Sequence, residues 1–272
     1  MLQPPYTKYD WLYVYHLDLD QVPELADPDL IGAWQEGDTV ILFFHKSKDR
    51  FIEEFCRENK CRVVYQADLS YLDWEAGHEI RPFKMGPLTV APVWESGPAD
   101  IRLDPSVIFG SGFHPTTRLC LQELISLAVS APEQIRRALD LGCGTALLAI
   151  AAAKLAIQDI QAMDVNNLAC RVARANVERN QAGGRVEVIQ RDLLAAPPIT
   201  KGVDLVMANL YRGLLTSLFG NPDFWQARYY IISGFMVPME EALLAELPAD
   251  KLRFLARHRQ DKWCVWVLAR KD

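Results

Sequence analysis

Residues 137–164 read RALDLGCGTALLAIAAAKLAIQDIQAMD, and this stretch decides the fold. A short apolar run closes on Asp140, a Gly-Cys-Gly turn leads into an apolar helix, and a second apolar run closes on Asp164. Gly142 and Gly144 lack a Cβ, so the backbone can turn sharply and lie flat against a ligand. Free N–H groups at the helix start can bind polar or anionic atoms. The pattern predicts a nucleotide-binding strand, turn and helix; the alternative is a plain strand-to-helix connection.

The acid that closes the second apolar run favours a nucleotide-binding turn over a plain connection. Asp164 lies 20 residues after Gly144, where a doubly wound sheet places the carboxylate that accepts hydrogen bonds from a ribose diol. A dinucleotide site requires G-x-G-x-x-G, because the pyrophosphate needs backbone contact further into the helix. Leu147 and Leu148 stand where the third glycine is needed, so a dehydrogenase is disfavoured.

The glycine turn is a better match for another cofactor. The S-adenosylmethionine pattern is acid-x-G-x-G-x-G, in which the ligand presents a methionine moiety instead of phosphates. Asp140, Gly142 and Gly144 match this pattern, and Ala146 replaces the last glycine. The turn therefore predicts an S-adenosylmethionine site with one departure, an extra methyl group at the start of the helix.

Length and composition indicate a two-part globular enzyme. The chain has 272 residues, of which 50% are hydrophobic and 24% charged, enough for one larger and one smaller domain. Its apolar runs are shorter than the ~18 residues needed to span a bilayer. Residues 1–10 have neither a basic flank nor an apolar core, so we expect no secretory signal. These features predict a cytoplasmic protein without membrane contact.

The six cysteines predict neither disulfides nor a metal site. They form no CxxC pair and have no metal-ligand spacing with the five histidines, so reduced thiols and no bound metal are expected. Cys143 lies inside the glycine turn, where a nucleophile is conceivable, but a small apolar filler is the better interpretation. We assign it no chemistry.

Charge is unevenly distributed along the chain. Residues 1–75 contain 15 acids and seven bases, a net charge of −8, and the rest carries +2 of the total of −6. An acidic front part disfavours nucleic acid, whose phosphates require lysine and arginine. It suits a basic protein partner. The alternative is a solvated acidic surface.

The front part has mixed elements and no nucleotide-binding turn. We expect strands over 11–19, 39–44 and 61–65, a helix over 49–59, a short helix over 71–79, and a linker with a return strand over 81–94. The predicted domains are a small α+β substrate-recognition domain over 1–75, a linker and return strand over 76–105, and a cofactor-binding domain over 106–272.

From residue 135 onward the pattern alternates between strands and helices, which demands a parallel sheet with right-handed crossovers. A closing hairpin would add an antiparallel strand on the edge side. We expect strands over 138–141, 160–164, 186–190, 203–209 and 229–233, helices over 146–157, 167–181, 212–219 and 238–246, and a hairpin from 252–259 and 263–269.

Two further segments point to the ligand. Residues 104–121, DPSVIFGSGFHPTTRLCL, contain two glycines and then a helix start, where Thr116 or Thr117 could cap the helix or offer a hydroxyl to a ligand. A simple capped helix start is the alternative. Asn209 follows the fourth strand, and carboxyl ends of parallel strands are where such sheets bind ligands. The alternative is a buried asparagine that satisfies the backbone.

These segments together resemble one family. FGSGFHPTT (109–117), DLGCGTALLAIAAAKL (140–155), Asp164 and ANLY (208–211), in this order and spacing, closely resemble the methyltransferases that modify large-subunit ribosomal protein L11. The resemblance extends from about residue 70 to the C-terminus and includes Asp73-Trp74, residues 91–94 and Ser233-Gly234. The first 70 residues resemble the family only in size and strand-rich character.

The resemblance implies a class I methyltransferase fold, with a doubly wound, Rossmann-like sheet of seven strands, and a mobile link to an N-terminal substrate-recognition domain. It implies that the loop from Phe109 to Thr117 folds over S-adenosylmethionine, with Thr117 touching it. The remaining matches assign Asp140, Gly142 and Gly144 to the turn under the methionine moiety, Asp164 to the ribose, Asn209 to the methyl group, and, more weakly, Asp192 to the adenine edge.

The implied reaction is methyl transfer to an amine of ribosomal protein L11, a basic partner. The enzyme must hold the amine nitrogen in line with carbon and sulfur, and desolvation lowers the pKa of a lysine so that it is neutral. With no general base in the motifs, we expect catalytic Asn209 and the Leu210 carbonyl to orient the amine while water takes the proton. The alternatives are a protein-lysine methyltransferase with another substrate and a non-catalytic cofactor-binding interaction protein.

Overall fold

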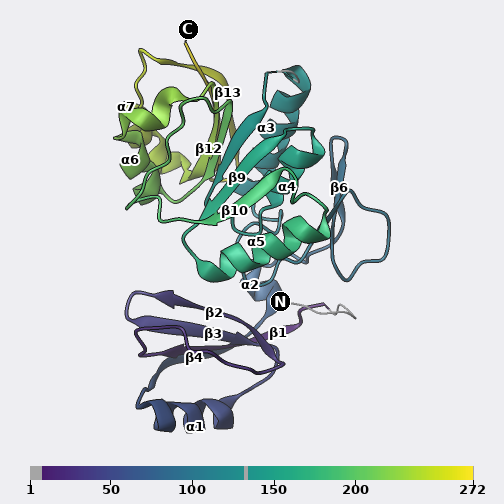
Figure 1. Ribbon diagram of the computed structural model, residues 1–272, viewed down its shortest axis with the longest axis vertical. Helices are drawn as coiled ribbons and strands as arrows, with labels where there is room; N and C mark the ends of the chain where they lie inside the picture. Colours follow the sequence, from purple (N-terminus) through teal and green to yellow (C-terminus); the bar gives the residue numbers. More distant parts are fainter. Residues whose placement is uncertain (1–7, 132–133, 272) are drawn as a thin grey trace.

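The computed structural model describes residues 8–131 and 134–271, and the strands of that part form three sheets (Figure 1). The front sheet is antiparallel and has the order β2-β3-β1-β4. Its strands and helices are β1 (Trp11–Leu17), β2 (Leu30–Glu36), β3 (Thr39–Phe44), α1 (Asp49–Asn59), β4 (Val63–Ser70) and α2 (Tyr71–Trp74).

The front sheet is covered on both faces, which explains why β3 is apolar from Val40 to Phe44. Alternate residues of β1 and β3 pack on one side against Ile52 and Cys56 of α1. The other set, including Phe43, packs against Leu168 and Val172 of α5 (Asn167–Arg179). Figure 1 accordingly shows α1 below the front sheet and α5 above it. The front sheet is therefore held directly against the larger part of the chain.

A small sheet connects the two parts. It has the order β5-β6-β7 and contains β5 (Phe83–Met85), β6 (Leu88–Pro92) and β7 (Ile101–Leu103). Its inward side chains, such as Val90 and Ile101, join the same apolar cluster as α3 (Pro115–Ser130). The connection is therefore packed onto the larger part.

The larger sheet has seven strands in the order β10-β9-β8-β11-β12-β14-β13. All neighbouring pairs are parallel except the two made by β14. Strand order reverses between β8 and β11, and ligands of open α/β sheets bind outside the carboxyl ends at such a point. The strands are β8 (Arg137–Leu141), β9 (Asp159–Asp164), β10 (Val186–Gln190), β11 (Leu205–Asn209), β12 (Tyr229–Met236), β13 (Leu252–Gln260) and β14 (Trp263–Arg270).

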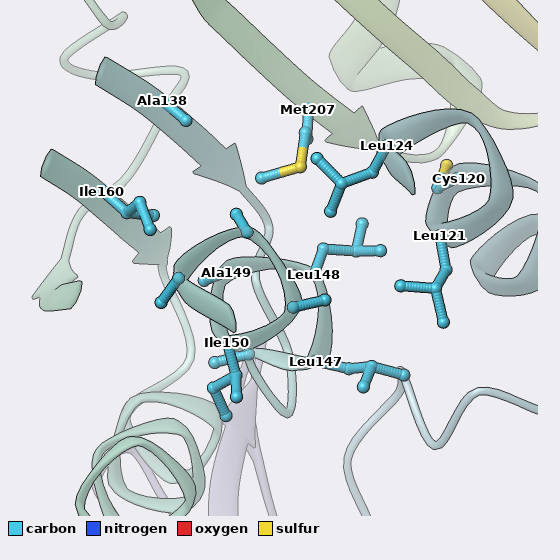
Figure 2. Close-up of a cluster of buried hydrophobic side chains, with 14 of the residues drawn as sticks. Cys120, Leu121, Leu124, Ala138, Leu147, Leu148, Ala149, Ile150, Ile160 and Met207 are labelled. Atoms are coloured by element: carbon cyan, nitrogen blue, oxygen red, sulfur yellow. The ribbon is translucent and has the colours of Figure 1, made fainter. Parts of the chain in front are cut away.

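Helices cover both faces of this sheet. One face packs against α3, α4 (Leu147–Lys154) and α5. Figure 2 shows Leu147, Leu148 and Ile150 of α4 in this buried cluster, with Leu148 facing α3 and Ile150 on the side away from it. The other face packs against α6 (Arg212–Phe219), the 3₁₀ turn η1 (Pro222–Gln226) and α7 (Glu240–Ala245), which follows a second 3₁₀ turn, η2 (Val237–Met239). Because α4 is apolar except for Lys154 at its end, it is buried and holds the glycine turn rigidly at its N-terminus.

Most of the helices and strands predicted from the sequence are confirmed, and so is the seven-stranded α/β sheet. Several details differ. Strand β2 was not predicted, β4 continues to Ser70, the helix expected over 71–79 ends at Trp74, and the segment 81–94 forms two strands, β5 and β6, in place of one return strand. The closing hairpin lies on the edge side as expected, with β14 antiparallel to β12 and β13 outermost. The domain boundary near residue 75 stays a prediction. In the described ranges, none of the helices is both long and apolar enough to cross a membrane.

Candidate active site

The glycine turn after β8 is tied to the end of β9 by its own backbone. The N–H groups of Gly142 and Cys143 both donate to the Met163 carbonyl, at 2.8 and 2.9 Å. The N–H of Gly144 donates to Oδ2 of Asp164 at 3.0 Å. The turn and the acid that the sequence singled out therefore form one rigid unit at the carboxyl edge of the sheet.

Glycine is required at two positions of this turn. Gly144 has φ +52°, and a Cβ there would lie 2.2 Å from the Phe109 carbonyl oxygen. Gly142 has φ +68°, and a Cβ there would lie 2.3 Å from Cδ2 of Leu210. Both conformations are left-handed, which favours glycine. At Gly144 the Phe109 backbone leaves no space for a side chain, and at Gly142 the Leu210 side chain would have to shift. The turn thus brings the loop at Phe109 and the segment after β11 together.

Ala146, the departure from the glycine pattern, has φ +63° and is fully buried. It precedes α4 without a side-chain cap, and the carboxylate of Asp140 takes that task by accepting from the Ala149 N–H at 3.1 Å. Burial raises the pKa of Asp140 to about 7, with Asp164 adding to the rise and the Ala149 N–H opposing it. Asp140 therefore holds the helix start from beneath the cleft.

Asp164 ends β9 and faces the cleft. Besides the Gly144 N–H it accepts from the Asn166 N–H, which bonds Oδ1 at 2.9 Å. Burial raises the pKa of Asp164, and the N–H groups of Asn166, Gly144 and Val165 oppose that rise. Each carboxylate oxygen has more than one acceptor site, so both can also accept from hydroxyl groups of a ligand.

The loop that contains Phe109 closes onto the glycine turn. Thr145 donates its N–H to the Phe109 carbonyl at 3.1 Å and its hydroxyl to the Gly110 carbonyl at 2.7 Å. The Phe109 side chain is 53% exposed, so it is presented to solvent rather than to the core. The loop is thereby fixed through its backbone, and an aromatic side chain is left over the cleft.

The segment after this loop reaches β11. His114 caps α3 by accepting from the Thr116 N–H at 3.3 Å. Thr117 is buried, and its hydroxyl accepts from Nδ2 of Asn209 at 3.4 Å. Asn209 and Thr117, 92 residues apart in sequence, therefore meet beside the cleft.

A cleft of about 540 Å³ opens at the carboxyl ends of β8, β9 and β11. Of the predicted site residues, Phe109, Gly142, Gly144, Asp164 and Asn209 line it. Thr117 and Asp140 do not: Thr117 supports Asn209 from behind, and Thr116 lines the cleft in its place. Asp192, the weaker match, accepts from the N–H groups of Leu194 and Ala195 in its own loop. The roles of all these residues in cofactor binding stay predictions.

Sequence reasoning missed the aromatic walls of the cleft. Trp34 of β2, Trp74 of α2, His114 and Trp263 of β14 all line it. His114 and Trp74 belong to motifs quoted above, so local sequence could have suggested them. Trp34 and Trp263 come from distant segments and carry no local signal. The front part of the chain thus supplies part of the site.

These residues fit a nucleoside cofactor. The glycine backbone forms a flat floor, a carboxylate stands where a ribose diol would lie, and indole rings flank both. Across the residues that the structure places, no group of three or more His, Cys, Asp or Glu could hold a metal ion. Burial raises the pKa of Cys143, so its thiol is not an activated nucleophile.

Comparison with known proteins identifies the family. The model of the family described as ribosomal protein L11 methyltransferase (PrmA) matches residues 31–271. The chain belongs to this family. The match begins within β2, so the family likeness reaches further toward the N-terminus than the motifs after residue 70 indicate. The cofactor of this family of class I methyltransferases is S-adenosylmethionine.

Individual relatives of the chain agree with this family assignment. A ribosomal protein L11 methyltransferase from Synechococcus sp. (strain RCC307) is 33% identical over 199 residues, which are 67% of this chain and 63% of the relative, less than two thirds of its length. One from Lacticaseibacillus paracasei is 30% identical over 266 residues, 90% of this chain and 80% of the relative. The crystal structure of a ribosomal protein L11 methylase from Lactobacillus delbrueckii subsp. bulgaricus superposes with a TM-score of 0.60 and 24% identity, over 71% of this chain and all of that one. That likeness supports the class I fold.

Proposed function

We propose that this chain is an S-adenosylmethionine-dependent protein N-methyltransferase that acts on large-subunit ribosomal protein L11, at lysine ε-amines, the N-terminal α-amine, or both. One observation carries the proposal: Asn209 lines the same cleft as Gly142, Gly144 and Asp164. A polar group for an acceptor thus stands beside the floor and acid for a nucleoside. Family membership and the names of the relatives support the reaction and the substrate.

One half of the cleft binds S-adenosylmethionine by its shape and by hydrogen bonds. S-adenosylmethionine supplies, when bound, an already activated methyl group. The backbone of Gly142 and Gly144 takes the methionine moiety, and Asp164 accepts hydrogen bonds from the ribose hydroxyls. Phe109, fixed by its backbone to Thr145, covers the opening and excludes water.

The acceptor half positions an amine. Because Nδ2 of Asn209 is held by Thr117, Oδ1 is presented as an acceptor for an amine N–H, together with the Leu210 carbonyl. Removal from water inside the cleft favours the neutral, nucleophilic form of the amine. Water takes the released proton. Asn209 thus acts by orientation, which can contribute several orders of magnitude to a rate when the geometry is near attack.

The front part recognises the substrate protein. Ion pairs within this part engage four of its seven bases with its own acids, and the excess acidity is left for a partner. This favours a basic ribosomal protein by steering and complementary contacts, and it disfavours nucleic acid. We place the reaction in the cytoplasm, with its substrate. The pairs are Lys46 with Asp29, Lys48 with Asp27 and Asp29, Arg50 with Glu54, and Arg62 with Asp18.

Incubation with methyl-labelled S-adenosylmethionine and a cell lysate tests the proposed substrate. We expect label in one small basic ribosomal protein, identified as L11 by mass spectrometry of the labelled band. Label in other proteins but not in L11 would support methyltransferase activity and contradict the assignment of L11 as the substrate. No label in any protein, with S-adenosylhomocysteine still bound in calorimetry, would indicate a cofactor-binding protein without this activity.

A further inference from the structure

A second cavity adjoins the cofactor cleft. It has a volume of about 490 Å³ and is lined by Glu75, Ser111, Asp261 and Lys262, among others. It also shares five lining residues with the cleft, namely Trp74, Ile108, Phe109, His114 and Trp263. The two spaces are therefore neighbours separated by a wall of mainly aromatic side chains.

The wall has a defined geometry. The His114 ring meets the Phe109 ring edge-on, with 5.1 Å between centroids, and the Trp263 ring in the same manner at 4.7 Å. His114 thus lies between the loop over the glycine turn and the start of β14. Burial lowers the pKa of His114, with His78 and Lys262 contributing, so the ring is neutral near pH 7 and adds no charge to the wall.

Glu75 brings a carboxylate to this aromatic cavity. It follows α2 directly and is half-buried, and its Oε2 accepts from the Ser111 hydroxyl at 2.7 Å. Burial raises the pKa of Glu75, while hydrogen bonds from Ser111 and Tyr71 oppose the rise. Ser111 belongs to the loop that closes on the glycine turn, so the carboxylate is fixed relative to the cofactor cleft.

A carboxylate among indole rings is a binding site for an alkylammonium ion. The carboxylate supplies a charge-assisted hydrogen bond, and the ring faces attract a cation. The chain already shows one such contact at the rim, where the Lys262 ammonium lies 5.9 Å from the centroid of the Trp263 ring. Asp261 adds a second acid to the lining, and His78 is exposed to solvent.

We propose that this second cavity receives the protonated acceptor amine of the substrate, with Glu75 as its counter-ion and Trp74 and Trp263 as its aromatic walls. The amine gives its proton to water as it moves past His114 into the cofactor cleft, and it reaches Asn209 as the neutral nucleophile. The inference rests on the proposed function. It makes Glu75 a positioning residue for the acceptor, distinct from Asn209 beside the reacting atoms.

Direct binding tests the cavity without any turnover. The probe is n-butylammonium, compared with neutral n-butanol, and the readout is the set of nitrogen-labelled tryptophan indole N–H signals in NMR, assigned with Trp74→Phe and Trp263→Phe. We expect n-butylammonium, but not n-butanol, to shift the Trp74 and Trp263 signals. The shifts should vanish in Glu75→Gln and persist in Glu79→Gln, an exposed acid outside the cavity. Equal shifts in Glu75→Gln and the unmodified chain would overturn the proposal.

Kinetics with L11 separate this proposal from the proposed function. Loss of one charged hydrogen bond should raise KM for L11 about tenfold in Glu75→Gln and change kcat little. Unchanged S-adenosylhomocysteine affinity shows that the variant is folded. A lower kcat at unchanged KM would contradict the role of Glu75. If L11 is not methylated at all but the Glu75-dependent butylammonium shifts remain, the substrate assignment fails and the amine site stands.

Discussion

Leu168 of α5 packs directly on the backbone of Gly32 in β2. A Cβ on Gly32 would lie 2.5 Å from both Cδ atoms of Leu168, which is itself buried. This contact fixes the front sheet against the helix that follows Asp164. Trp34, two residues further along β2, is thereby placed in the wall of the cofactor cleft. The docking of the front part is thus coupled to the shape of the site.

The Gly32–Leu168 contact predicts a non-additive pair of mutations. Gly32→Ala overpacks the interface and should destabilise the chain by about 1–3 kcal/mol. Leu168→Ala should cost about 2–5 kcal/mol alone, but less in the Gly32→Ala background, where its removal makes room. Chemical unfolding of the four proteins measures this. Gly183→Ala, where a Cβ meets nothing, is the control. Strict additivity would show that the two residues do not press on each other.

Replacement of Asp164 should weaken binding of the cofactor. Asp164→Asn removes the charge and an acceptor for the ribose, and a hydrogen bond to a charged group is worth about 1.5–3 kcal/mol. Calorimetry with S-adenosylhomocysteine should therefore show binding weakened by about tenfold to a hundredfold. Asp159→Asn, at the other end of β9 and bound to Arg137, should bind normally. Equal affinities in the two variants would remove Asp164 from the site.

At Gly144 we expect a side chain to destabilise the protein through steric contact as well as through backbone strain. Gly144→Ala and Gly202→Ala both put a side chain on a left-handed residue, which costs about 1–2 kcal/mol. Only at Gly144 would the new Cβ meet another atom, the Phe109 carbonyl oxygen at 2.2 Å. Thermal unfolding should show a larger drop in Tm for Gly144→Ala, and this variant should also lose affinity for S-adenosylhomocysteine. Similar results at both positions would mean that the loop does not press on the turn.

Asp140 predicts a pH-dependent stability. Burial raises its pKa from 3.8 to about 7, so between these values the folded chain holds a proton that the unfolded chain has released. Stability must then fall as the pH rises through this window, by about 1.4 kcal/mol per unit of pKa shift at most. Asp140→Asn keeps an acceptor for the Ala149 N–H but cannot titrate. Its free energy of unfolding should fall less between pH 4 and about 7 than that of the unmodified chain. Parallel curves would place the Asp140 pKa near its usual value.

Local sequence was sufficient for the larger sheet. The strands are marked by apolar or alternating runs and the helices by a longer period, so β10 and α6 were predicted with the bounds that the structure has. Gly142, Gly144, Asp164 and Asn209 were found by the same local rules, because the ends of parallel strands meet at one edge.

What the sequence could not supply depends on tertiary packing. Strand β2 was missed because LIGAWQE contains a glycine, and the need for Gly32 arises only from Leu168 of a distant helix. Trp34 and Trp263 reach the cleft from opposite ends of the chain, and neither has a motif around it. For Thr117 the motif was recognised but the position of the side chain was not. Its hydroxyl is hydrogen-bonded to Asn209 behind the cleft.

Methylation of purified ribosomal protein L11 tests the central claim most directly. L11 is incubated with S-adenosylmethionine and either the unmodified chain or Asn209→Ala, and its intact mass is recorded over time. We predict that the unmodified chain adds one or more methyl groups, and that Asn209→Ala is slower by at least about a hundredfold, with its affinity for S-adenosylhomocysteine nearly unchanged. The account would be contradicted if the mass of L11 does not change in the presence of the unmodified chain, or if the unmodified chain and Asn209→Ala methylate L11 at equal rates.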